Sequence, residues 1–93
     1  MLLAINANNT NVKFALFDGD TIVGEWRQHT SASRTADEHA VWLSQLFDLN
    51  GFDREVVTDT AIASVVPQAL FNLRRLCSYY FKSEPLVLGD DET

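Results

Sequence analysis

Residues 2–17 have the sequence LLAINANNTNVKFALF, in which two apolar runs flank the polar segment NANNTN at residues 6–11. The first run, residues 2–5, is uniformly apolar and predicts a central strand that is buried on both faces. The second run, residues 12–17, alternates in the manner of a strand, with Val12, Phe14 and Leu16 on one face. The polar segment is therefore predicted to be a tight turn between two paired strands.

This polar turn is the candidate functional site, because a tight turn can present backbone N–H groups and hydroxyls to an anion. The candidate phosphate-facing residues are Asn6, Asn8, Asn9, Thr10 and Asn11, with Lys13 on the next strand as a weaker companion. None of them is a carboxylate that could hold a metal ion. An asparagine-rich turn can also satisfy its own backbone through side-chain hydrogen bonds, so a purely structural role is the alternative.

The next segment predicts a third strand and a helix. Asp18-Gly19-Asp20 is typical of a hairpin turn, and residues 21–28 predict a half-exposed antiparallel strand with Ile22, Gly24 and Trp26 on one face. Thr35 and Glu38 have the spacing of a capping box, which predicts that a helix covers residues 36–49. Asn50-Gly51 supplies the left-handed end of this helix.

The remaining residues predict a strand, a helix and a strand. Residues 60–66 are β-branched and almost uncharged, which is typical of a strand covered on both faces and ended by Pro67. Helical spacing of apolar residues predicts a helix over residues 68–81, and residues 86–88 predict a last buried strand. The fold class is therefore α/β, with the order β-β-β-α-β-α-β and two helices on a mixed sheet. Residues 1–89 are expected to form one domain, and residues 90–93 an acidic tail.

Composition narrows the classes of partner and environment. The chain of 93 residues has a net charge of −6, and its seven basic residues are dispersed, so a nucleic-acid partner is not expected. Cys77 has no second cysteine to pair with, and neither a signal peptide nor a membrane-spanning run is recognised, so we expect a cytoplasmic location. The two histidines, His29 and His39, are not accompanied by the clustered ligands of a metal site.

The order of elements resembles the ribonuclease H-like half-domain of the superfamily that contains acetate and sugar kinases, heat-shock chaperones and actin. The local sequences resemble the N-terminal domain of type III pantothenate kinase. Four segments carry this resemblance: Leu2-Leu3-Ala4-Ile5 with Asn9-Thr10-Asn11 and Phe14-Ala15-Leu16-Phe17-Asp18-Gly19; Trp26-Arg27; Arg34-Thr35-Ala36-Asp37-Glu38; and Ile62-Ala63-Ser64-Val65-Val66-Pro67 with Leu73-Arg74-Arg75-Leu76.

The resemblance implies an enzyme that transfers the ATP γ-phosphate to pantothenate in coenzyme A biosynthesis. It also implies magnesium, a monovalent cation (potassium or ammonium) and a dimer. The family's phosphate motif is Asp-x-Gly-Asn-Thr, whereas this chain has Asn6 at the Asp position and Asn8 at the Gly position. The family also has a further domain with the adenosine site and the catalytic Asp, and that domain is expected to be missing here.

These departures predict that this chain alone is inactive. Phosphoryl transfer depends on positioning and charge neutralisation, and Asn6 lacks the negative charge that would orient hydrated magnesium. The alternative is that the chain is a non-catalytic interaction module. In that case the half-domain pairs with itself or with another chain, through surfaces that the missing C-terminal domain would otherwise cover. A nuclease of the ribonuclease H type is disfavoured, because Asn6 stands where two-metal chemistry needs a carboxylate.

Overall fold

The computed structural model describes residues 1–88, which form one five-stranded sheet and two α-helices. The elements are β1 (Leu2–Ala7), β2 (Asn11–Asp18), β3 (Thr21–His29), α1 (Ala36–Leu49), a short 3-10 helix η1 (Arg54–Val56), β4 (Asp59–Ser64), α2 (Pro67–Tyr80) and β5 (Leu86–Leu88). The predicted α/β class and the order of strands and α-helices are confirmed, and the architecture is that of a ribonuclease H-like half-domain. The predicted acidic tail, residues 90–93, lies outside the described residues.

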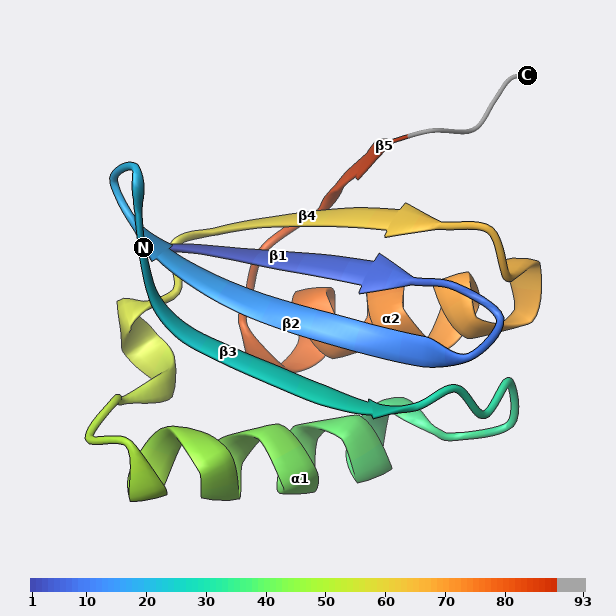
Figure 1. Cartoon of the computed structure of the whole chain (residues 1–93), viewed down its shortest axis with the longest axis horizontal. Helices are drawn as coiled ribbons and strands as arrows, with labels where there is room; N and C mark the ends of the chain where they lie inside the picture. Colours follow the sequence, from blue (N-terminus) through green and yellow to red (C-terminus); the bar gives the residue numbers. More distant parts are fainter. Residues whose placement is uncertain (89–93) are drawn as a thin grey trace.

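The sheet is mixed, with the strand order β3-β2-β1-β4-β5. β1 is central: it pairs antiparallel with β2 on one side and parallel with β4 on the other. Ile5 marks this register, since it lies opposite Phe14 of β2 and Ile62 of β4. The first three strands therefore form a meander, and the last two strands extend the sheet in parallel (Figure 1).

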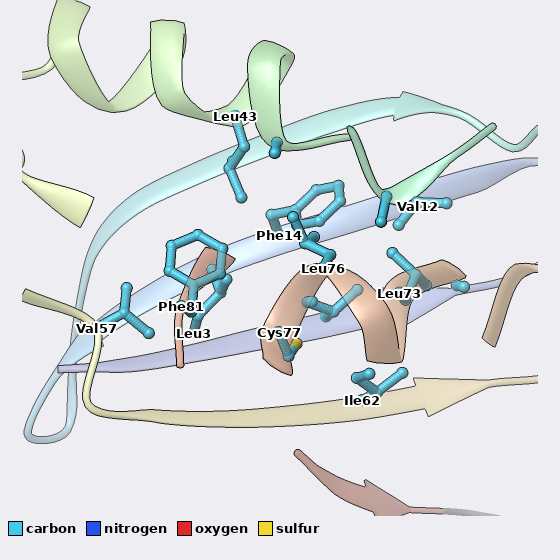
Figure 2. Packing of buried hydrophobic residues seen from close by; sticks show 14 of the residues in the cluster. Leu3, Val12, Phe14, Leu43, Val57, Ile62, Leu73, Leu76, Cys77 and Phe81 are labelled. Carbon is cyan, nitrogen blue, oxygen red and sulfur yellow. The ribbon is translucent and has the colours of Figure 1, made fainter. Parts of the chain in front are cut away.

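Both α-helices cover the same face of the sheet (Figure 1). Figure 2 shows Leu43 of α1 and Leu76 of α2 directed towards Phe14 at the centre of this layer. These three side chains are fully buried, together with alternate residues of the strands. The alternation of β2 was thus predicted correctly, because its apolar positions Val12, Phe14 and Leu16 all belong to this core.

The opposite face of the sheet is not covered by any element of residues 1–88, and we call it the open face. The prediction that β1 and β4 are buried on both faces is therefore wrong. In β1, Leu3 and Ile5 are buried whereas Leu2 is exposed; in β4, Ala61 is only half-buried. These strands lack a polar alternation because small and apolar residues occupy both faces, so their composition did not reveal which face is covered.

A β-bulge changes the faces of β3. Leu16 pairs with Gly24 and Phe17 pairs with Ile22, which leaves Val23 as the extra residue. The prediction that Ile22 shares a face with Gly24 and Trp26 is therefore wrong, since the bulge moves Ile22 to the open face. Trp26 instead turns to the helix side, where its ring centroid lies 5.3 Å from that of Phe47.

The predicted signals for α1 are confirmed. The Thr35 backbone N–H donates to Glu38 Oε1, and the Glu38 backbone N–H donates to Thr35 Oγ1, which completes the capping box. Gly51 follows the helix with a φ of +80°, a conformation that glycine adopts without a Cβ clash. The Tyr80 hydroxyl donates to Asp37 Oδ1 and joins the two helices.

The end of the described chain corrects two further predictions. Pro67 begins α2 instead of only ending the preceding strand. Proline is tolerated in the first turn of a helix, because the N–H groups there have no intrahelical acceptor. The strand at residues 86–88 exists, but it is not buried: β5 lies at the sheet edge and its two leucines are exposed.

Candidate functional site

The polar turn is shorter than predicted. β1 continues through Asn6 to Ala7 and β2 begins at Asn11, so only residues 8–10 leave the ladder. The Asn8 backbone N–H closes the turn by donating to the Asn11 carbonyl over 2.9 Å. Asn6 is therefore a strand residue, because the ladder of β1 continues two residues beyond the apolar run.

The Asn8 side chain binds the backbone of its own turn. Its Oδ1 atom accepts the backbone N–H of Thr10 at 3.0 Å and that of Asn11 at 2.8 Å. This is the local side-chain-to-backbone bonding for which asparagine is favoured in turns. The structural alternative predicted for the turn is thus confirmed for Asn8, and two of the N–H groups expected to face an anion are already bound.

A residue far away in the sequence braces the turn. Thr30, just after β3, donates its hydroxyl to the Asn8 carbonyl at 2.7 Å and its backbone N–H to the Thr10 carbonyl at 3.0 Å. Arg34 in turn donates to the carbonyl of His29 at 2.7 Å. Sequence reasoning missed Thr30, because no local pattern reports a contact between the first turn and the segment that leads to α1.

Asn6 and Lys13 lie next to the turn but on the open face. They are partners in the β1–β2 ladder, and both line a trough of about 300 Å³ on that face. Arg27 of β3 is the ladder partner of Lys13 on its other side. Directly opposed residues in a sheet have Cβ atoms roughly 5 Å apart, so two cations stand side by side here.

The six predicted site residues therefore form two adjoining groups. Asn8, Asn9, Thr10 and Asn11 form the turn, whereas Asn6 and Lys13 form the end of the trough nearest to it. Arg27 was not predicted as a site residue, although its position is explained by the pairing of β2 with β3. The arrangement combines partly occupied backbone donors with two adjacent positive charges, which is suited to an anion, although the carboxylate of Glu25 lines the same trough.

Apart from Glu25, the rest of the trough is lined by apolar residues. These are Ala4, Ile5, Ala15, Phe17, Ile22, Ala61, Ala63 and Leu88. A larger hollow of about 530 Å³ lies at the opposite end of the molecule, where α1 ends and η1 follows. Its charged lining residues are Asp48, Asp53, Glu55 and Arg54, so acidic groups outnumber the single cation there.

Two buried titratable groups lie outside the site. Burial lowers the pKa of His39 to about 4, and it raises the pKa of the Cys77 thiol to about 11. Both side chains are thus neutral near pH 7 and act as core residues. Within residues 1–88, no three His, Cys, Asp or Glu side chains gather as metal ligands, and neither helix is long and apolar enough to cross a bilayer.

Comparison with known proteins identifies the family. A family model described as type III pantothenate kinase matches residues 2–93. The type III pantothenate kinase of Paramagnetospirillum magneticum is 55% identical over 91 residues, which are 98% of this chain and 35% of that protein. The type III pantothenate kinase of Rhizorhabdus wittichii is 60% identical over 89 residues, or 96% of this chain and 34% of that protein.

The relative from Maricaulis maris, also a type III pantothenate kinase, is 56% identical over 90 residues, with 97% of this chain and 35% of that protein covered. The chain thus spans about a third of the length of these relatives. The range matched by the family model includes the polar turn. The chain belongs to the type III pantothenate kinase family.

Proposed function

We propose that this chain supplies the first phosphate-facing turn of a cytoplasmic type III pantothenate kinase, which transfers the ATP γ-phosphate to pantothenate in coenzyme A biosynthesis. Family membership supports the reaction class. The observation that carries the assignment to the turn is the side-by-side position of Lys13 and Arg27 at its base. In this proposal Asn9 and Thr10 contact the phosphate, and Lys13 neutralises part of its charge.

The turn fits an anion better than it fits a magnesium ion. Its donors are carboxamides and a hydroxyl, whereas magnesium sites in proteins use carboxylates together with substrate phosphates. Asn6 has the shape of the family's aspartate without its charge, so a phosphate meets no repulsion there and a hydrated metal meets no anchor. We therefore propose that this chain binds ATP phosphates but does not by itself catalyse transfer, and that magnesium and the monovalent cation require groups from elsewhere.

An NMR titration tests this assignment. The isotope-labelled chain is titrated with ATP, with and without magnesium, and the backbone amides of residues 6–13 are followed; pantothenate is added last. We expect saturable shifts confined to the turn, and their loss in Lys13→Ala but not in Lys82→Ala, a matched change just beyond the C-terminal end of α2. Unmoved amides at millimolar ATP would refute the assignment.

The role of Asn6 is tested in the same assay. Asn6→Asp restores the carboxylate of the family motif, so it should make ATP binding stronger with magnesium and weaker without it. The magnesium dependence separates a metal-anchoring effect from a general change in the turn. Equal binding under both conditions would show that this position does not face the phosphate.

Self-association is the second candidate function, and the open face favours it. Ile22, Leu86 and Leu88 are 51%, 64% and 48% exposed on or beside this face. The three parallel strands β1, β4 and β5 are of the kind normally covered on both sides. We propose that the family's dimer, or a C-terminal part supplied by another chain, covers this face.

Sedimentation velocity over a hundredfold range of concentration tests the second candidate. We expect a concentration-dependent mass that Leu88→Lys abolishes, because the charge lies on the open face. Leu49→Lys is the matched control, since Leu49 is exposed at the end of α1, outside the open face. A monomer at every concentration would exclude association through this face.

A further inference from the structure

The backbone groups of the polar turn are almost all in use. The carbonyls of Asn8, Thr10 and Asn11 accept hydrogen bonds from Thr30 or from within the turn. The N–H groups of Thr10 and Asn11 both converge on Asn8 Oδ1. Within residues 8–11 of the described chain, Asn9 is the exception, because neither its backbone N–H nor its carbonyl has a hydrogen-bond partner.

A carboxamide oxygen held by two converging N–H groups occupies the position in which such groups hold an oxyanion. Paired backbone N–H donors in a turn form an anion-binding concavity, and charged acceptors bind them more strongly than neutral ones. The Asn8 oxygen is neutral, but it is tethered to the same turn, so its effective concentration is far above that of a free phosphate. The two acceptors compete for the same two donors.

We infer that Asn8 is an internal ligand of this turn, which a phosphate must displace before it can bind. The inference rests on the proposed phosphate-facing function of the turn. Asn8 then sets the affinity of the site: removing its carboxamide frees the N–H groups of Thr10 and Asn11 for the phosphate oxygens. The two hydrogen bonds from Thr30 hold the carbonyls of the turn in place when the side chain is removed.

Three variants separate the possible effects of Asn8. Asn8→Gly removes the internal ligand and should tighten the binding of inorganic phosphate about tenfold, the worth of roughly one net hydrogen bond. Asn8→Asp keeps the acceptor, adds a negative charge and should weaken phosphate binding at least tenfold. Gln45→Ala is the control: Gln45 is exposed on α1, outside the turn, and its carboxamide makes no hydrogen bond within residues 1–88, so phosphate affinity should stay within twofold.

Hydrogen exchange of the ligand-free chain tests the internal contact itself. The amides of Thr10 and Asn11 should exchange at least tenfold more slowly than that of Asn9, and Asn8→Gly should remove this protection while Gln45→Ala leaves it. This comparison needs no ligand, and the amides of β1 and β2 report in the same spectrum whether each variant is folded. Unprotected Thr10 and Asn11 amides in the unmodified chain would overturn the inference.

The phosphate titration, read by the same amides, distinguishes the two hypotheses. Equal phosphate affinity of the unmodified chain and Asn8→Gly would overturn the inference and leave the proposed function standing. If Asn8→Gly removes the protection of the Thr10 and Asn11 amides but no variant binds phosphate, the proposed function of the turn is refuted. The proposed competition between Asn8 Oδ1 and phosphate is then refuted as well. Tighter binding by Asn8→Gly together with freed amides supports both.

Discussion

Acidification from pH 7 to pH 5 should destabilise this protein through one histidine. His39 is only 2% exposed and lies on α1, with its ring centroid 6.2 Å from that of Phe14. Its Nδ1 atom has no hydrogen-bond partner in residues 1–88. The pKa of His39 is lowered from 6.5 to about 4, mainly by burial and also by the positive charge of Arg34, while the negative charge of Glu38 partly opposes these effects.

The sign and size of the effect follow from linkage. Because the folded pKa of His39 lies below the unfolded one, the unfolded chain takes up the proton first as the pH falls. The contribution to stability is complete above pH 6.5 and is lost progressively between pH 6.5 and pH 4. The loss between pH 7 and pH 5 is about 2 kcal/mol, with a limit of about 3 kcal/mol at lower pH.

Urea unfolding at pH 7, 6 and 5 measures this loss. The unmodified chain and His29→Gln, which changes the exposed histidine of β3, should each lose about 2 kcal/mol at pH 5. His39→Leu keeps the site apolar and has no titratable group there, so its free energy of unfolding should fall by less than about 1 kcal/mol between pH 7 and pH 5. The ring protons of His39 report its pKa directly by NMR, and a value above 6 in the folded protein would refute the reasoning.

Three further predictions concern packing, capping and thiol chemistry. A Cβ at Gly24 would lie 2.5 Å from Cη2 of Trp26, so Gly24→Ala should lower the free energy of unfolding by about 1–3 kcal/mol, as measured with urea. The same substitution should cost less in a Trp26→Leu background, and an equal cost in both backgrounds would contradict the clash. Thr35→Ala removes half of the capping box and should cost about 1 kcal/mol by the same assay; a change below about 0.3 kcal/mol would show that the cap is dispensable. Burial raises the pKa of the Cys77 thiol to about 11, so at pH 8 it should react with an aromatic disulfide reagent at least about 100-fold more slowly in the native chain than in the urea-unfolded chain. Similar rates in the two states would mean that the helix layer opens readily.

Local signals predicted the α-helices and the order of elements along the chain well. The limits of α1 at residues 36 and 49 were predicted correctly, because a capping box and a following glycine are encoded within a few residues of each end. The pattern of β2 was also read correctly, since its charged Lys13 distinguishes the two faces. These features depend on neighbours in the sequence and need no knowledge of the tertiary structure.

Features that depend on distant partners were not predictable in the same way. The open face could not be inferred from β1 and β4, because an alanine such as Ala61 is compatible with either a covered or an uncovered surface. The bulge at Val23 shifts β3 by one residue without a glycine or proline at that position. At the site, the sequence allowed both uses of Asn8; the structure confirms the self-bonding one, and the binding of phosphate stays a prediction.

The central position of β1 also sets the order in which this chain can fold during synthesis. β1, β2 and β3 are contiguous, so their meander can pair as soon as residues 2–29 have left the ribosome. The other edge of β1 must wait for β4, which is made only after α1 and η1. Until then an unpaired strand edge is available to neighbouring nascent chains. Conditions that slow translation between residues 30 and 58 should therefore lengthen the interval in which this protein is prone to aggregate.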